Sequence, residues 1–121
     1  MAALAKSKNM TRIWCCIRPH RLEEVKTAIA DLGASGMSVS DVRGSGNSPE
    51  TARSFAGQSV VVPLPVRAKL DVVVPDALVD AVVEAILHHA QTGEPGDGKI
   101  FLEPVDDAIR VRTGERGEDA V

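Results

Sequence analysis

The sequence predicts an α+β fold, a ferredoxin-like βαββαβ sandwich in which two helices cover one face of an antiparallel sheet. Two strand–helix–strand units follow one another along the 121 residues, and they share details. Each first strand ends at a proline, Pro19 or Pro75, with a leucine three residues later. Each helix then ends at a glycine, Gly33 or Gly93. An internal duplication of this length is typical of that sandwich.

The first unit follows residues 1–11, which show no periodicity and which we expect to be a flexible lead. Residues 12–18 are short, β-prone and apolar in the middle, as in a buried strand. Apolar side chains then recur at helical spacing up to Gly33, namely Leu22, Val25, Ile29 and Leu32. Residues 37–43 alternate apolar and polar side chains, which predicts a strand with one solvated face.

The second unit begins after a long polar connection, residues 44–63, which is β-prone again only at 60–62. Connections this long are usually functional, so we expect it to order on a ligand or partner; a plain flexible connector is the alternative. Residues 66–74 predict the third strand, and Pro75 opens a helix with the apolar stripe Val79, Val82, Val83, Ile86 and Ala90. A glycine-rich turn at 92–98, a strand at 99–102, a short β-segment at 109–112 and an acidic tail at 116–121 follow.

Two helices can cover only one face of this sheet, and the other face then indicates whether the protein forms oligomers. Ile13, Val39, Val72 and Val74 are too many apolar side chains for two helices to hide if their neighbours are also apolar. We therefore expect another copy of the chain to cover the second face.

The composition restricts the possible functions. The chain has 14 Lys and Arg against 17 Asp and Glu, a net charge of −3, which disfavours a protein that coats nucleic acid. With one Trp, two Phe and no Tyr, it also lacks the stacking platform of an RNA-binding sheet. No apolar run approaches the roughly 20 residues of a membrane span, and the opening Met-Ala-Ala-Leu-Ala is too short for a signal peptide. We therefore expect a cytoplasmic protein with no nucleic-acid partner.

The turn Gly93-Glu-Pro-Gly-Asp-Gly-Lys99 matches the Walker spacing, yet it follows a helix and opens a strand, so a P-loop is rejected. Its glycines permit the positive φ angles of an anion-binding nest, and Lys99 adds positive charge. A glycine-rich helix cap is the alternative.

Two pairs of cations stand two residues apart on predicted strands, so each pair projects to one side. Arg110 and Arg112 suit phosphate oxygens and, together with Lys99, predict a phosphate clamp; alone they would be a solvated edge. Arg67 and Lys69 suit a small carboxylate or bicarbonate, the alternative being an exposed strand face.

No metal site, cofactor or catalytic group is predicted. Cys15 and Cys16 point to opposite faces of a strand and are expected to be buried, unreactive thiols. No zinc spacing links His20, His88 and His89, and no Ser-His-Asp grouping or carboxylate pair is present.

Several motifs occur together along the chain. They are Ile17-Arg-Pro19, Gly36-Met37, Val42-Arg-Gly44-Ser-Gly46, Val73-Val-Pro-Asp76, Thr92-Gly-Glu-Pro-Gly-Asp-Gly-Lys-Ile-Phe101 and Ile109-Arg-Val-Arg-Thr-Gly-Glu115. Residues 12–115, which contain them, resemble the PII family of nitrogen-regulatory signalling proteins.

The resemblance implies a non-catalytic homotrimer that binds adenine nucleotides in clefts between subunits. The residues it assigns to the phosphates are Gly96, Asp97, Gly98, Lys99, Arg110 and Arg112, with Gly46 of the neighbouring subunit. Those it assigns to adenine and ribose are Gly36, Met37, Ser38, Asp71 and Val73. Residues 44–63 correspond to the T-loop, which docks on target proteins, and residues 92–99 to the B-loop.

The departures from the family pattern are also informative. Val60 stands where many members carry a tyrosine that is uridylylated, so that control is absent. Asn47 and Ser48 replace the usual Arg-Gln, which helps to hold phosphates and 2-oxoglutarate with Mg²⁺. We therefore expect ADP or AMP to matter more than ATP. By these losses the chain is similar to PII-like proteins tied to carboxysomes and inorganic carbon uptake, some of which respond to bicarbonate.

The sequence thus predicts a regulatory protein that reads an adenine nucleotide, with bicarbonate beside Arg67 and Lys69 as a co-effector. Its partner is expected to be a transporter, with a membrane transporter as one candidate, or an enzyme of inorganic carbon or nitrogen metabolism. Phe55, near the tip of the long connection, is the candidate anchor in that partner. The alternative function is a weak ATP-hydrolysing enzyme that uses the same phosphate site.

Overall fold

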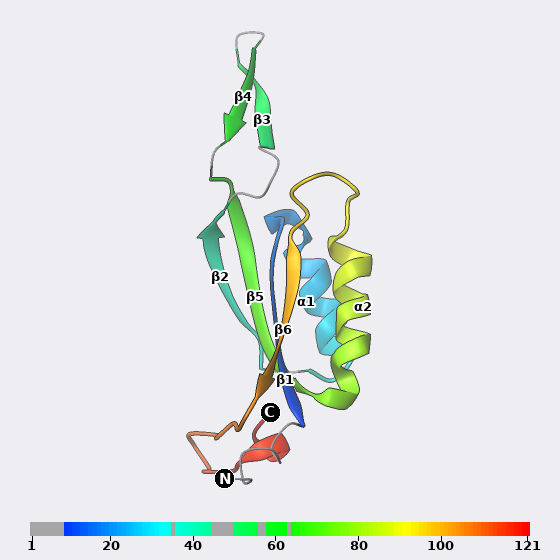
Figure 1. The fold of residues 1–121 in the computed structure, drawn as a ribbon, viewed down its shortest axis with the longest axis vertical. Helices are drawn as coiled ribbons and strands as arrows, with labels where there is room; N and C mark the ends of the chain where they lie inside the picture. The colour runs from blue at the N-terminus through cyan, green and yellow to red at the C-terminus, as the bar shows by residue number, and fades with distance from the viewer. Residues whose placement is uncertain (1–8, 35, 45–49, 56–57, 63) are drawn as a thin grey trace.

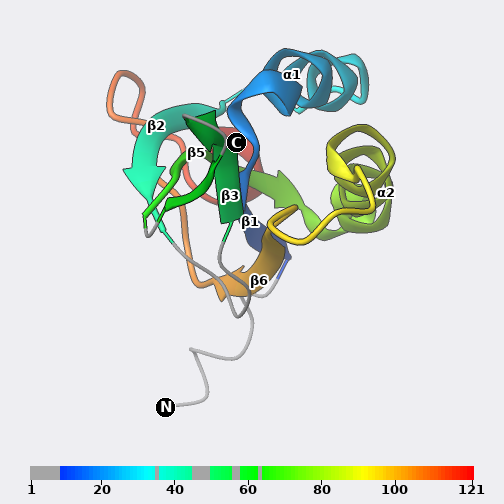
Figure 2. The same cartoon turned by 90° about the horizontal axis from the view of Figure 1, so that it is seen from above.

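The computed structural model describes residues 9–34, 36–44, 50–55, 58–62 and 64–121, with backbone alone for 50–55 and 58–62. Its main sheet has four antiparallel strands in the order β2-β5-β1-β6. These strands are β1 (Met10–Ile17), β2 (Ser38–Arg43), β5 (Val66–Pro75) and β6 (Lys99–Val105). Helices α1 (Leu22–Asp31) and α2 (Val79–Ala90) lie side by side on one face of the sheet (Figures 1 and 2). The predicted ferredoxin-like sandwich is confirmed.

Each helix is entered through a short 3-10 turn, Pro19–Arg21 before α1 and Asp76–Leu78 before α2. Proline suits the start of such a turn because its missing N–H would have no partner there. The predicted end of the first helix at Gly33 is confirmed, since Gly33 has φ +98° and its N–H donates to the carbonyl of Ala30 at 3.0 Å.

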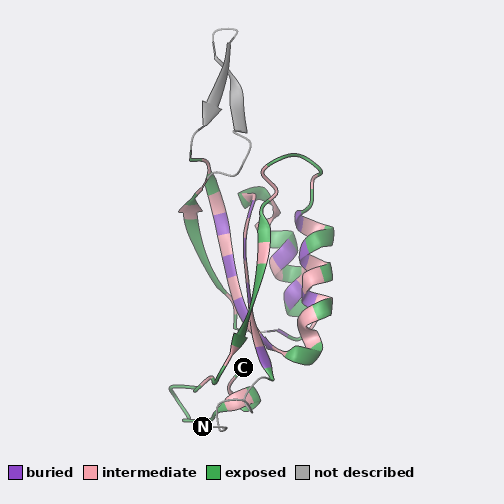
Figure 3. Ribbon diagram, viewed as in Figure 1, coloured by how far each residue is buried: buried purple, intermediate pink, exposed green. Residues whose placement is uncertain are grey.

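The core lies between the sheet and the two helices (Figure 3). Alternate residues of β1 and β5 point into it, so that Ile13, Val72 and Val74 are fully buried together with helix residues such as Ile29 and Ile86. The four residues Ile13, Val39, Val72 and Val74 were expected not all to be hidden; three of them are covered by the helices, and Val39 alone remains exposed, at 43%. The alternation of side chains along β1 and β5 places Ile13, Val72 and Val74 on the helix side. The same alternation puts the polar residues of β5, such as Lys69 and Asp71, on the other face.

The face of the sheet that carries no helix is aromatic and charged. The strand register sets Trp14 between Asp71 and Phe101, and the rings of Trp14 and Phe101 stack with centroids 4.4 Å apart. Lys69 Nζ lies 4.7 Å from the centroid of the Trp14 ring. The pattern of single apolar residues could not predict this face, because its cohesion comes from cross-strand pairs.

The long connection 44–63 contains a second, two-stranded sheet that the sequence analysis did not predict beyond residues 60–62. Strands β3 (Glu50–Phe55) and β4 (Gln58–Val62) pair antiparallel and extend past the end of the main sheet where β5 begins (Figure 1). Phe55 is the last residue of β3 and opposes Gln58, and its side chain lies outside the description. Gly46, expected near the phosphates of a neighbouring subunit, lies outside the described residues.

The predicted β-segment at 109–112 is wrong. Ile109 makes an isolated bridge with Arg116, and between them the chain turns, with Gly114 N–H donating to the Arg110 carbonyl at 2.7 Å. Gly114 has φ +77°, which favours a turn over a continuing strand. The acidic tail forms a 3-10 helix at Gly117–Ala120, and β6 runs on to Val105 through Pro104, which an edge strand tolerates.

Gly98 provides a test of how the 92–98 turn meets β1. It has φ +100°, and a Cβ added there would lie 1.9 Å from the carbonyl oxygen of Cys16. We expect Gly98→Ala to lower the free energy of unfolding by roughly 2–5 kcal/mol, from the strained φ angle and the displaced strand. Gly93→Ala is the control, because Gly93 has φ +89° but nothing within 4 Å of an added Cβ. Urea denaturation of both variants measures the difference, and equal losses would contradict the close approach.

Candidate functional site

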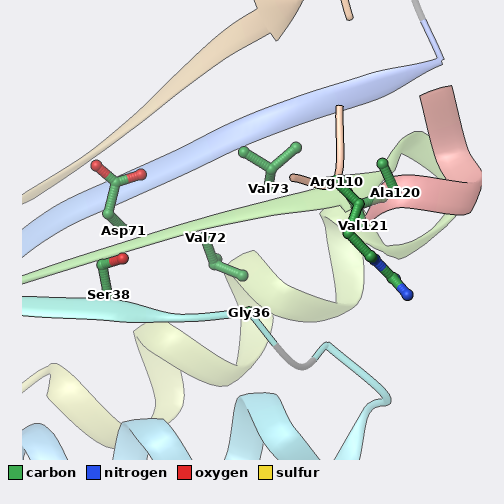
Figure 4. Close-up of a pocket in the computed structure, with 8 residues that line it drawn as sticks. All are labelled: Gly36, Ser38, Asp71, Val72, Val73, Arg110, Ala120 and Val121. Carbon is green, nitrogen blue, oxygen red and sulfur yellow. The ribbon is translucent and has the colours of Figure 1, made fainter. Parts of the chain in front are cut away.

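A cavity of about 380 Å³ opens beside β5 at the end of the sheet away from the β3–β4 hairpin (Figure 4). It is lined by Gly36, Ser38, Asp71, Val72, Val73, Arg110, Ala120 and Val121. Four of the five residues predicted for adenine and ribose are therefore brought together, along with one predicted phosphate ligand. Met37 is the exception, because its side chain packs against the core.

The carboxylate of Asp71 is held in place by Arg12 from the neighbouring strand. Arg12 Nε donates to Asp71 Oδ1 at 2.9 Å, and Arg12 Nη1 donates to Glu103 Oε1 at 2.6 Å on the other side. The hydrogen bonds with Asp71 and then Glu103 raise the pKa of Arg12 above its ordinary value. The sequence analysis missed Arg12, although an arginine within a predicted sheet strand signals a carboxylate partner across the sheet.

The apolar wall of this cavity that comes from Ala120 and Val121 was also missed. The 3-10 helix Gly117–Ala120 lies over the cavity because hydrogen bonds to Asp107 hold the residues at its start. There Asp107 accepts hydrogen bonds from Arg116 Nη2 at 2.6 Å and from the Gly117 N–H at 3.1 Å. In the sequence, the only sign that this segment would line a cavity is that the apolar residues Ala120 and Val121 follow its acidic residues.

The turn at 92–98 is organised around the carboxylate of Asp97. That carboxylate accepts hydrogen bonds from Thr92 N at 2.8 Å, from Gly93 N at 2.9 Å and from the Thr92 hydroxyl. It also accepts a hydrogen bond from Arg18 Nε at 3.1 Å. Burial would raise the pKa of Asp97, but the bonds from Thr92, Gly93 and Arg18 outweigh it and hold that pKa well below its usual range. Because the Asp97 carboxylate already has these partners, only the backbone of Asp97 is available to a ligand.

The backbone of this turn contains two residues with positive φ angles. Gly96 and Gly98, on either side of Asp97, both have φ +100°, the left-handed conformation that an anion-binding nest requires at alternate positions. Lys99 follows on the surface, and its ammonium makes no hydrogen bond or ion pair with the residues that the structure describes. A cavity of about 150 Å³ lies beside the turn, between it and α2.

The predicted phosphate clamp is not assembled within one chain. Lys99 opens β6, whereas Arg110 and Arg112 follow its other end, so the seven-residue strand separates them by roughly 20 Å (Figure 1). Arg110 instead pairs with Glu115, at 3.4 Å, and Arg112 is exposed in the turn that replaces the predicted β-segment. Within one protomer these cations therefore do not meet, and a clamp formed between protomers stays a prediction.

Arg67 and Lys69 share the open face of the sheet, as their spacing predicted, but they have different neighbours. Lys69 lies over the Trp14 ring. Burial and then the positive charge of Arg18 lower the pKa of Arg67, so the two guanidinium groups are close enough to repel. Whether a small anion binds there stays a prediction.

Of the two thiols expected to be buried, Cys15 is buried and Cys16 is not. Cys15 is buried, and this burial followed by the charge of Cys16 raises its pKa to about 11, whereas Cys16 is half-buried on the open face. Among the residues that the structure describes, no group of three His, Cys, Asp or Glu side chains could hold a metal ion. No helix in the described segments is long and apolar enough to cross a membrane.

Comparison with known proteins gives consistent matches over nearly the whole chain. Residues 10–115 match the family model described as "Nitrogen regulatory protein P-II". The chain is 46% identical over 112 residues to the Haemophilus influenzae protein of that name, which covers 93% of this chain and 100% of that protein. It is also 46% identical to "Nitrogen regulatory protein P-II 2" of Methanothermobacter thermautotrophicus, over 93% of this chain and 97% of that protein.

Solved structures agree with these matches. The structure of the Bacillus subtilis GlnK–ATP complex superposes with a TM-score of 0.77 at 31% identity, over 95% of this chain and 100% of that chain. A second B. subtilis GlnK structure gives a TM-score of 0.76 at 30% identity, over 93% and 99% of the two chains.

The occupied carboxylate of Asp97 predicts a pH effect on stability. Because its folded pKa lies below the unfolded value of about 3.9, the ionised group stabilises the fold above that pH and stops doing so as the pH falls through the folded value. We expect Asp97→Asn to lower the melting temperature at pH 7 and the gap to the parent to shrink below pH 4. Asp41→Asn, at an exposed site on β2, is the control and should have little effect at either pH. A gap that stays constant down to pH 2.5 would contradict this role.

Proposed function

The chain belongs to the nitrogen regulatory protein P-II family, and from this premise we propose that it is a non-catalytic signalling protein that binds an adenine nucleotide between the subunits of a homotrimer. It would act in the cytoplasm by regulating a partner protein. The observation that carries the proposal is the division of its candidate site between the two ends of β6.

Each end supplies what the other lacks. The Gly96–Gly98 turn with Lys99 offers backbone amides and a positive charge, which suit phosphate oxygens. The cavity at the other end offers Val73, Ser38 and Asp71, which suit a base and a ribose, and Arg110 at its rim. One end of one protomer facing the other end of the next would join base, sugar and phosphate sites in a single cleft.

The chemical class of the ligand follows from these groups and from a relative. The B. subtilis GlnK neighbour is described as a complex with ATP, which supports an adenine nucleotide for this chain as well. Asn47 and Ser48 replace cationic and amide side chains of the family pattern, and this favours ADP or AMP, which need fewer phosphate contacts.

The signal would leave through residues 44–63. Strands β3 and β4 extend this segment beyond the main sheet, where a partner can reach it, and Phe55 at the end of β3 is the proposed apolar anchor. A ligand that favours one arrangement of this segment shifts the population that the partner recognises. The partner proposed is a transporter or an enzyme of inorganic carbon or nitrogen metabolism.

A small anion such as bicarbonate is the proposed co-effector. Arg67 is the second residue of β5, shortly after the long connection, and it lies on the same open face as Lys69. An anion there would relieve the repulsion between Arg67 and Arg18, and Arg18 in turn contacts the 92–98 turn. Nucleotide and anion would thus act on connected groups.

Subunit mixing tests the shared site. We expect Lys99→Ala and Arg110→Ala each to weaken ADP or ATP binding at least tenfold, as loss of a charge-assisted hydrogen bond does. Co-expressed and mixed, the two variants should regain tight binding in one cleft of each mixed trimer, because that cleft takes its lysine from one chain and its arginine from the other. Calorimetry with ATP, ADP and AMP measures the sites.

Failure of the mixed protein to regain binding would contradict a cleft shared between subunits, and a monomer in light scattering would contradict the trimer. Sustained ATP turnover that Lys99→Ala abolishes would instead favour the hydrolytic alternative.

Bicarbonate binding predicts reciprocal coupling. We expect saturating bicarbonate to change the affinity for ADP or AMP several-fold, and the nucleotide to change the affinity for bicarbonate by the same factor. Arg67→Gln should abolish this coupling, so that its nucleotide affinity is the same with and without bicarbonate, because the variant lacks both the anion's partner and the repulsion that the anion relieves. Chloride at equal ionic strength is the control, and equal effects of the two salts would contradict a specific site.

A further inference from the structure

Arg18 lies just beyond the end of β1 and reaches across to the 92–98 turn. Its Nε donates to Asp97 Oδ1 at 3.1 Å, and its Nη2 donates to the backbone carbonyl of Pro95 at 2.6 Å. The Arg18 side chain is 20% exposed and that of Asp97 is 22% exposed, so this pair is largely removed from water. A guanidinium therefore holds the turn at two points two residues apart.

The turn depends on such side-chain contacts. The recorded hydrogen bonds of the Thr92, Gly93 and Glu94 amides go to the Asp97 carboxylate and the Thr92 hydroxyl rather than to a helix or strand partner. Glycines with positive φ angles give the same segment unusual backbone freedom when it is not held. Arg18 adds a side-chain tie between this internally bonded turn and the end of β1.

We propose that Arg18 is a positioning residue for nucleotide phosphates, which fixes the Gly96–Gly98 amides and Lys99 in their binding geometry without touching the ligand. This inference rests on the proposed function. Its two identified donors are directed at Pro95 and Asp97, and its charge is balanced by the Asp97 carboxylate. The contribution of Arg18 is therefore the geometry of the turn and not added positive charge at the phosphates.

The planar guanidinium explains why an arginine stands here. It presents donors in a fixed fork that reaches a carboxylate and a carbonyl at once, whereas a lysine ammonium has one donor atom on a flexible stem. Arg18→Lys keeps the charge but loses one of the two contacts, and Arg18→Gln loses the charge as well. A graded loss across these two variants separates positioning from simple electrostatic attraction.

Ligands with and without phosphate provide the test. We expect Arg18→Gln to weaken ATP and ADP binding about tenfold in calorimetry, Arg18→Lys to weaken it less, and both to leave adenosine binding at millimolar concentration unchanged. Hydrogen exchange of the unliganded protein should be faster at the 92–98 amides in Arg18→Gln and unchanged in β5. Arg21→Gln is the matched control, because Arg21 pairs with Glu24 on α1 at 3.7 Å and should change none of these readouts.

Each outcome bears on one of the two ideas. Unchanged ATP and ADP affinity in Arg18→Gln, or an equal loss of adenosine binding, overturns the positioning role and leaves the proposed function standing. Should the variant fold poorly, Thr92→Val removes the Thr92 hydroxyl from Asp97 and must show the same phosphate-selective loss. If the parent protein binds none of ATP, ADP and AMP, the proposed function fails and this inference fails with it.

Discussion

The length of β6 is the constraint on which the candidate site depends. Its seven residues hold the Gly96–Gly98 turn and Lys99 at one end of the protomer and the cavity with Arg110 at the other. Packing against β1 fixes this separation, because the register aligns the strands residue by residue from Lys99 to Val105. Neither end alone holds a base, a ribose and a phosphate chain. In the proposed trimer, ligand binding and subunit assembly would therefore be one physical problem, and a change at a subunit contact would be felt at the ligand.

The open face of the sheet gives assembly a particular chemistry. Near Trp14 its charges are matched within the protomer, where Arg12 lies between Asp71 and Glu103. Its aromatic rings, Trp14 and Phe101, are stacked on each other, and Phe101 remains 42% exposed. A facing surface would then gain from aromatic contact without having to neutralise many charges, since the ion pairs are already formed. The same arginine that orders this face also orients the Asp71 carboxylate at the rim of the cavity, so the two roles share one side chain.

Periodicity predicted the regular elements well, because burial against two helices leaves a strong pattern in sequence. The strands β1, β2 and β5 and both helices lie within a few residues of their predicted bounds. What failed depends on contacts between distant segments. The β3–β4 hairpin has little apolar alternation, and the turn after Ile109 is set by the Arg116–Asp107 pair and by Gly114. The sequence predicted which residues would contribute to the site. Its spacing could not show that β6 would keep Lys99 apart from Arg110 and Arg112.

Arg18 connects features that the sequence treats as separate. It follows the last residue of β1, it holds the 92–98 turn through Pro95 and Asp97, and its charge lowers the pKa of Arg67 on β5. The like charges of Arg18, just beyond β1, and Arg67, on β5, are tolerated here because the Asp97 carboxylate compensates Arg18. Any change of charge near Arg67 alters the field at Arg18, and Arg18 is bonded directly to the turn. Arg18 thus lies between Arg67 and the glycine turn, and the proposed anion would act on the turn through this one side chain.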